Sequence, residues 1–165
     1  MGNNLYLGIN MNTANQSFIN SLIRGAQEAM KTFGVPASVT IAQAILESAW
    51  GKSALTRTAN NLFGIKADAS WHGDKVNMPT TEYVHGNPVK VNAYFRKYNS
   101  LAESIQDHAR FLKENHRYAS AFECSSGIEF SSAIAKCGYA TDTHYAKLLI
   151  SLINQYDLDQ YDHVM

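Results

Sequence analysis

The sequence lacks an excess of either charge, because 14 lysine and arginine residues balance 14 aspartate and glutamate residues. Nucleic-acid-binding domains are usually basic, so this balance argues against nucleic acid as a partner. The sequence also lacks an apolar run of the roughly 18 residues that a membrane-spanning helix needs. Its first twelve residues contain no lysine or arginine and only a short, broken apolar stretch, unlike a cleavable signal peptide. We therefore expect synthesis in the cytoplasm without such a peptide, and no membrane insertion.

Cysteine is scarce as well, since the chain has only Cys124 and Cys137, thirteen positions apart. This spacing matches no zinc or redox motif. A disulfide between them is possible after export, whereas two independent thiols are the alternative that we favour for the cytoplasm. The six histidines show no metal-ligand spacing, and the sequence has neither a G-x-S-x-G motif nor a phosphate-binding glycine loop. We therefore expect no metal and no organic cofactor.

Length and hydrophobic periodicity predict one mainly helical (α+β) domain. The 165 residues suffice for one domain with a core, but not comfortably for two. The helical spacing of apolar residues predicts helices over 17–33, 36–51, 101–112, 128–137 and 143–156. Two β-type runs from Thr80 onward, on either side of the segment 85–88, predict a hairpin. A cleft between a helical lobe and this small β-lobe would suit a long substrate.

The most informative residue is Glu47, the single carboxylate within the apolar run from Ile41 to Ala49. At about 100° per residue, Glu47 shares a helix face with Gln43 and Trp50, next to the one apolar stripe that would face the core. Apolar surroundings disfavour the charged form of a carboxylate and raise its pKa. Glycosidases use such a protonated carboxyl group to protonate the leaving oxygen. An exposed, solvated glutamate is the alternative, and the spacing alone does not choose between them.

Hydrolysis of a glycosidic bond usually needs a second group, which activates water or stabilises the positive charge on the sugar. The loop and hairpin region offers three carboxylates: Asp68, Asp74 and Glu82. We favour Glu82, because alternate residues of its strand would face the cleft; a solvated strand residue is the alternative. Among the aromatic residues, Trp50 is expected to contact a ligand, since it shares the face of Glu47. Tyr94 and Phe95 are expected in the core.

Three segments of the chain match the motifs of one known family, in the same order. They are SVTIAQAILESAWGKSALTRTANNLFGIKA, TTEYVHGNPVKVNAYFRKYNSLAESIQDHARFL and GYATDTHYAKLLISLI. These segments resemble glycoside hydrolase family 73, the bacterial peptidoglycan N-acetylglucosaminidases. The resemblance covers about residues 17–157, which would be the core of a single catalytic domain spanning 1–165. Residues 1–16 would then be an N-terminal extension.

The resemblance implies a lysozyme-like fold in which Glu47 is the general acid. Glu82 matches a hairpin carboxylate proposed as general base in some members, and participation of the substrate's N-acetyl group is the alternative. Tyr145 matches a tyrosine placed near the cleaved sugar. Thr143 replaces a proline found in many members and can still cap the next helix. Three motif positions that line or shape the cleft complete the expected substrate-binding set with Trp50: Asn61, Phe63 and Tyr139.

The implied activity is hydrolysis of peptidoglycan glycan strands between N-acetylglucosamine and N-acetylmuramic acid, carried out by a monomer. A lytic transglycosylase or muramidase is one alternative, and a non-catalytic module for glycan binding or envelope assembly is another. We expect the protein to act in the periplasm or cell wall of a target cell, as a secreted antibacterial effector or a phage endolysin. The neutral net charge favours the effector. An effector would need a cognate immunity protein that occludes the cleft.

Overall fold

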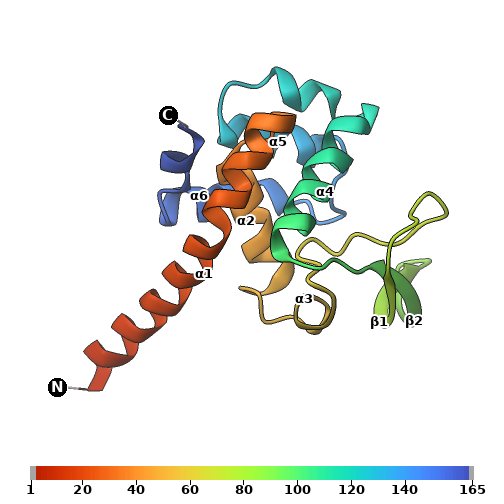
Figure 1. Ribbon diagram of the computed structural model, residues 1–165, viewed down its shortest axis with the longest axis horizontal. Helices are drawn as coiled ribbons and strands as arrows, with labels where there is room; N and C mark the ends of the chain where they lie inside the picture. The colour runs from red at the N-terminus through yellow and green to blue at the C-terminus, as the bar shows by residue number, and fades with distance from the viewer. Residues whose placement is uncertain (1–2, 164–165) are drawn as a thin grey trace.

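The fold is mainly helical with one small antiparallel sheet, as predicted (Figure 1). The computed structural model describes residues 3–163, with side chains from residue 13 onward. None of the helices within this range is long and apolar enough to cross a membrane. In chain order the elements are α1 (Asn3–Phe33), α2 (Ala37–Ser48), α3 (Ala54–Ala59), β1 (Lys75–Val84), β2 (Asn87–Arg96), α4 (Leu101–Glu114), the 3₁₀ helix η1 (His116–Glu123), α5 (Gly127–Lys136), α6 (Tyr145–Gln155) and the 3₁₀ helix η2 (Leu158–Asp162).

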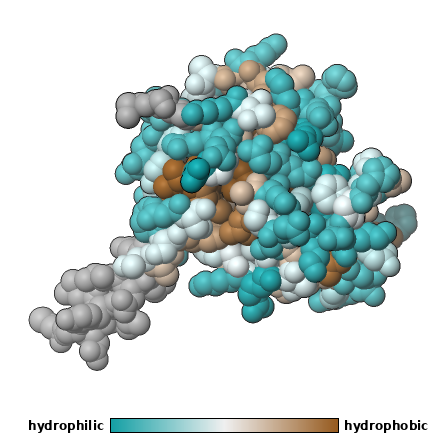
Figure 2. Space-filling view, in the orientation of Figure 1, coloured by the Kyte–Doolittle hydropathy of each residue, from teal (hydrophilic) through white to brown (hydrophobic). Residues whose placement is uncertain are grey.

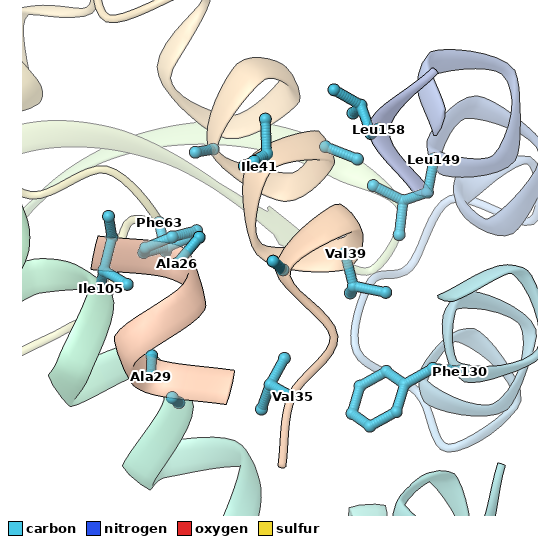
Figure 3. Close-up of a cluster of buried hydrophobic side chains, with 14 of the residues drawn as sticks. Ala26, Ala29, Val35, Val39, Ile41, Phe63, Ile105, Phe130, Leu149 and Leu158 are labelled. Atoms are coloured by element: carbon cyan, nitrogen blue, oxygen red, sulfur yellow. The ribbon is translucent and has the colours of Figure 1, made fainter. Parts of the chain in front are cut away.

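Helix α2 lies at the centre of the helical part, in contact with α1, α5, α6 and η2 (Figure 1). Every residue from Ala37 to Ile45 is buried. The prediction that only one stripe of this helix faces the core is therefore wrong. A helix enclosed on all sides is apolar almost all round, which explains its long apolar run. Figure 3 shows Val39 and Ile41 of α2 among core side chains from α1, α4, α5, α6 and η2: Ala26, Ile105, Phe130, Leu149 and Leu158.

Helix α1 is longer than the predicted 17–33, because it begins at Asn3 and ends at Phe33. Its N-terminal part projects away from the rest of the molecule, whereas the remainder packs against α4 and α2 (Figure 1). The hydrophobic pattern marks only the packed part. Once a helix has nucleated, each further residue adds one backbone hydrogen bond, so the helix continues beyond its tertiary contacts.

The hairpin forms where it is predicted, although β1 begins at Lys75 rather than Thr80. Its strands pair in register with Val84 opposite Asn87, which leaves His85 and Gly86 as the turn. Both turn residues have positive φ, 52° and 80°, as two-residue hairpin turns require.

Phe95 is buried as predicted, but Tyr94 is 50% exposed, so the prediction for Tyr94 is wrong. Neighbouring residues of a strand point to opposite faces of the sheet. Only the face that carries Phe95 packs against the core here, and Tyr94 lies on the other face.

The sequence predicts the N-terminal cap of α4 correctly but not that of α6. Ser100 caps α4, because its hydroxyl accepts the Glu103 N–H at 3.1 Å. At α6 the side chain of Asp142 accepts the His144 N–H at 2.8 Å, and the helix begins at Tyr145. Thr143 is therefore not the cap of this helix, contrary to expectation: His144 occupies the N-cap position, and no described side chain makes a capping hydrogen bond there.

The surface in Figure 2 is hydrophilic over most of the face shown, with a small apolar area near its middle, over α1 and α2.

Cys124 and Cys137 are both half-buried and both free, as favoured for two independent thiols. They line a shared pocket of about 400 Å³ between η1 and α5.

Candidate active site

Glu47 lies in the last turn of α2, immediately before a tight change of chain direction. Three successive residues there have positive φ values of 50°, 60° and 78°: Ala49, Trp50 and Gly51. This conformation costs a non-glycine residue about 1–3 kcal/mol, and such strain is common at functional sites. The Ser48 hydroxyl supports the turn by accepting the Gly51 N–H at 2.8 Å. The helix therefore stops directly after Glu47.

Glu47 opens onto a cleft of about 740 Å³ between the helical part and the loop and hairpin region. Ligand sites in proteins are commonly of this size. The lining mixes aromatic, aliphatic and charged groups, which suits sugar rings with apolar faces and polar edges. Besides Glu47, the cleft is lined by residues 63–66 with Asp68 and Arg96, and by Phe111, Arg117, Tyr118 and residues 138–141.

Tyr145 contacts Glu47 directly. Its hydroxyl donates to Oε1 of Glu47 at 3.1 Å, and Nε2 of Gln43 donates to the same hydroxyl oxygen at 2.9 Å. The ring of Tyr139 stacks on that of Tyr145 at 5.5 Å between centroids. Residues from α2, from the start of α6 and from the loop before α6 thus meet at the carboxyl group. Glu47 and Tyr145 are 98 residues apart in the sequence, and the packing of α2 against α6 brings them together.

Burial raises the pKa of Glu47, and the hydrogen bond from Tyr145 lowers it by less. Solvent still reaches part of the side chain through the cleft, because Glu47 is an exposed residue of the cleft floor. Burial also raises the pKa of the Tyr145 hydroxyl, so the phenol keeps its proton and can donate it to a hydrogen bond. Burial, the larger of the two effects on Glu47, favours its protonated form, which a general acid requires, whereas the hydrogen bond from Tyr145 opposes it.

Glu82 lies on β1 and forms an ion pair with Lys66. Lys66 lines the cleft, whereas Glu82 is outside the set of residues that line it. The second carboxylate that the structure brings to the cleft of Glu47 is Asp68. Hydrogen bonds from the hydroxyl and the backbone N–H of Ser70 lower the pKa of Asp68. Asp68 therefore contributes a fixed negative charge, while Glu82 adjoins the cleft through Lys66.

Trp50 is not in the cleft, which corrects its predicted role in substrate binding. Its ring packs edge-on against Phe18 of α1 at 6.1 Å and Tyr156 after α6 at 5.2 Å. The prediction extended the helical period to position 50. The helix ends at Ser48, and the positive φ values that follow turn the indole toward α1 and Tyr156 instead of the cleft.

Asn61 is buried, with 1% of its surface exposed, and makes hydrogen bonds to protein groups rather than to an open site. Its amide donates to the carbonyl oxygens of Ile65 at 3.0 Å and Arg96 at 2.9 Å. Its Oδ1 accepts the Gly64 N–H at 2.9 Å and the Ile65 N–H at 3.2 Å. Asn61 thus shapes the cleft by joining the loop 61–65 to β2, one of the two roles expected of its motif position, and it is not among the residues that line the cleft.

Phe63 and Tyr139 both line the cleft. Beneath Phe63 lies His108, whose ring stacks on it at 3.8 Å between centroids. His108 is fully buried, and burial lowers its pKa to about 3, so the ring is neutral. The part of the cleft wall formed by Phe63 is therefore backed by a packed, uncharged aromatic layer.

Several cleft residues have no obvious sequence signal. Arg96 lines the cleft while its guanidinium pairs with Asp107 at 2.9 Å and lies over the ring of Trp71 at 4.7 Å. Arg117 also lines the cleft. Gln43 shares the helix face of Glu47, and this spacing is the one signal that could have identified it. For the two arginines only the folded chain supplies the information.

Comparison with known proteins identifies the family. The sequence model described as mannosyl-glycoprotein endo-beta-N-acetylglucosaminidase, the glucosaminidase family, matches residues 23–158. The chain belongs to this family. The resemblance to glycoside hydrolase family 73 that the three motifs indicate is thereby confirmed, with its lysozyme-like fold.

Relatives of this glucosaminidase domain include two curated proteins. The peptidoglycan hydrolase FlgJ of Vibrio parahaemolyticus is 42% identical over 141 residues, which cover 83% of this chain and 46% of the relative. The exo-glucosaminidase LytG of Bacillus subtilis is 41% identical over 154 residues, covering 90% of this chain and 54% of the relative. The chain thus spans about half the length of these relatives.

Solved structures agree with this assignment. The catalytic domain of the autolysin Auto from Listeria monocytogenes superposes with a TM-score of 0.83 at 34% identity, covering 98% of both chains. The glycoside hydrolase domain of Salmonella typhimurium FlgJ superposes with a TM-score of 0.73 at 36% identity, covering 87% of this chain and 88% of that one. The glucosaminidase fold is therefore shared over nearly the whole chain.

Proposed function

We propose that this glucosaminidase domain hydrolyses the glycan strand of peptidoglycan between N-acetylglucosamine and N-acetylmuramic acid. The observation that carries the proposal is Glu47 at the floor of the cleft, with its pKa raised by burial and one oxygen held by Tyr145. The names of the relatives, peptidoglycan hydrolase and exo-glucosaminidase, support the substrate and the bond.

In the proposed reaction Glu47 gives its proton to the glycosidic oxygen as the bond from that oxygen to the anomeric carbon breaks. A water oxygen then forms the new bond to the anomeric carbon and releases a proton. Glu82 is one candidate to receive that proton as general base. In the alternative, the carbonyl oxygen of the substrate's N-acetyl group first bonds to the anomeric carbon, and water opens this ring. The position of Glu82 outside the cleft lining, paired with Lys66, supports the second route.

Product analysis tests the activity and separates it from the alternatives. Purified sacculi are digested, the products are reduced with borohydride, and chromatography with mass spectrometry identifies the new chain ends. We expect reduced N-acetylglucosamine ends. Reduced N-acetylmuramic acid would indicate a muramidase, anhydro-muramic ends a lytic transglycosylase, and no products a non-catalytic module. Any of these three results would refute the proposal.

The same digest distinguishes internal from terminal cleavage. Hydrolysis inside the strand shortens the polymer early, whereas hydrolysis from an end releases small products first. A cleft of about 740 Å³ that is open to solvent and lined from both parts of the molecule supports internal cleavage.

We further propose an antibacterial role for the domain, as an effector delivered to a rival cell or as an endolysin, with an immunity protein blocking the cleft in the effector case. The balanced charge supports the effector. Expression in Escherichia coli with and without an added periplasmic export signal tests this role. Lysis should require both export and an intact Glu47, and harmless export of an enzyme active on sacculi would contradict it.

A further inference from the structure

Gln43 is fully buried on α2, one helical turn before Glu47. Its Nε2 donates to the Tyr145 hydroxyl at 2.9 Å, and that hydroxyl donates to Oε1 of Glu47 at 3.1 Å. The three side chains form a linear chain of hydrogen bonds that leads from the buried Gln43 through Tyr145 to Glu47 in the cleft. A buried amide that bonds the tyrosine next to the proposed acid calls for an explanation beyond packing.

The direction of these hydrogen bonds follows from the donors available. A phenol has one proton, and an amide nitrogen only donates. When Gln43 donates to the Tyr145 oxygen, the single phenol proton is left for Glu47. If Gln43 presented its carbonyl oxygen instead, Tyr145 would donate to Gln43, and Oε1 of Glu47 would lose its donor.

The neighbouring Tyr139 supports this orientation of the amide. Its ring stacks on Tyr145 at an interplanar angle of 22°. Gln43 lowers the pKa of the Tyr139 hydroxyl, opposing the larger effect of burial, which is the direction expected of a nearby N–H donor. The Gln43 carbonyl oxygen has no partner within residues 13–163. The amide nitrogen of Gln43 therefore points toward the tyrosines, and the carbonyl oxygen of the same amide is left without a hydrogen bond in the described part of the chain.

The consequence for Glu47 concerns which oxygen carries the acid proton. Oε1 accepts from Tyr145, whereas Oε2 makes no hydrogen bond to the described part of the chain. A carboxyl group whose Oε1 is occupied as an acceptor carries its proton on Oε2. The oxygen without a protein partner is then the one available to a glycosidic oxygen in the cleft.

We propose that Gln43 is a positioning residue for the glycosidase reaction: it holds Tyr145 as a donor to Oε1 of Glu47 and thereby keeps the acid proton on Oε2. This inference rests on the proposed function, because it needs a measurable turnover. Gln43 does not touch the substrate, so its substitution should lower kcat and leave KM nearly unchanged.

A double-mutant cycle tests the proposal, with Gln43→Met, Tyr145→Phe and the double variant assayed on soluble glycan strands across pH. Gln43→Met should lower kcat on the order of tenfold, as expected for a misplaced proton donor. Without the Gln43 donor the phenol hydroxyl is no longer held toward Oε1, so the Tyr145 bond should weaken. Because this bond lowers the pKa of Glu47, its weakening should raise that pKa and move the basic limb of kcat/KM to higher pH. In the Tyr145→Phe background, Gln43→Met should change neither quantity.

Two further variants separate positioning from packing. Thr40→Val is the matched control, since Thr40 lies on the same helix, is fully buried and has a hydroxyl without a partner in the described chain. It should leave kcat and the pH profile unchanged. Gln43→Glu should approach wild-type activity at low pH, where a protonated carboxyl group can donate to Tyr145. At higher pH it should fall to the level of Gln43→Met, because an ionised carboxylate only accepts.

The proposal would be overturned if Gln43→Met lowered kcat equally in the wild-type and Tyr145→Phe backgrounds. It would also be overturned if Gln43→Met lowered kcat without moving the basic limb of kcat/KM. If Gln43→Met does not fold, the pH profile of Gln43→Glu still tests the proposal. Absence of turnover in the wild-type chain would instead count against the proposed function. The two failures are therefore distinguishable.

Discussion

The two carboxylates predicted to share the chemistry lie in very different surroundings. Glu47 lies at the C-terminal end of α2, directly after a stretch of nine buried residues that ends at Ile45. Its carboxyl group faces the cleft and accepts a hydrogen bond from Tyr145, whose hydroxyl in turn accepts one from Gln43. Glu82 is on a two-stranded hairpin with both strands largely exposed, and its contact is the ion pair with Lys66. Exposed ion pairs contribute only about 0–1 kcal/mol. The helical part therefore fixes its carboxylate, and the hairpin does not.

The different surroundings of Glu47 and Glu82 suit the two carboxylates to different roles. A group that must hold a proton near neutral pH needs partial desolvation and a fixed position, which Glu47 gains from burial at the cleft floor and from the hydrogen bond of Tyr145. A group on an exposed hairpin can change position without disturbing the core. The comparison predicts that changes around Glu47 act on the chemistry itself, whereas changes around Glu82 act weakly or through substrate binding.

Removal of the acid proton should have the largest effect. Glu47→Gln keeps the shape and the acceptor for Tyr145 but cannot donate an acidic proton, so we expect turnover of purified sacculi to fall roughly 100-fold to 10,000-fold. Circular dichroism should show an unchanged fold. Glu28→Gln on the exposed face of α1 is the matched control and should keep full activity. Near-normal turnover of Glu47→Gln would contradict the assignment of the acid.

The junction between the two regions should be next in importance. Asn61→Ala removes four hydrogen bonds from a fully buried side chain that join the loop 61–65 to itself and to β2. We expect a loss of about 2–4 kcal/mol in the free energy of unfolding, measured by urea denaturation. Asn92→Ala, in an exposed position of β2, should change it by less than about 0.5 kcal/mol. Equal stability of the two variants would show that the Asn61 network does not hold the cleft wall.

Substitution of the hairpin carboxylate should have a smaller effect. Glu82→Gln should lower kcat by less than about tenfold, well below the roughly 100-fold or greater loss expected for a general base. Lys66→Met removes the ion pair from the other side and controls for the pairing itself. Should Glu82→Gln prove as damaging as Glu47→Gln, the hairpin would have to close over the cleft in the working enzyme, and the contrast drawn above would not hold.

The smallest effect is expected at Trp50, which the structure places in the core rather than the cleft. Trp50→Phe should change kcat/KM by less than about twofold and the free energy of unfolding by about 1 kcal/mol. Thermal unfolding and an assay on sacculi measure both. A large increase in KM would return Trp50 to the substrate site and weaken the present description of the cleft.

The sequence predicts this molecule unevenly, for physical reasons. Glu47, the hairpin turn at His85 and Gly86, and the Ser100 cap depend on neighbours within a few residues, and local patterns reveal them. The local pattern misplaces Trp50, because a strained turn ends the helix before it, and Thr143, because the helix begins two residues later with His144 at its N-cap position. Arg96 and Asp68 come to the cleft only through tertiary packing, which periodicity does not encode. The extent of α1 was missed because its first turns make no amphipathic pattern with the core.

Titration of Glu47 itself is the measurement that tests the central claim most directly. Carbon-13 NMR of the Glu47 carboxyl group gives its pKa in the free enzyme, and the basic limb of kcat/KM gives the pKa of the group that must be protonated. Burial raises the pKa of Glu47, so activity should be retained below this pKa and lost as pH rises through it. We predict that the two values coincide above the ordinary glutamate value of about 4.3. A Glu47 that titrates at or below that value, or a rate that stays constant while Glu47 ionises, would contradict the account.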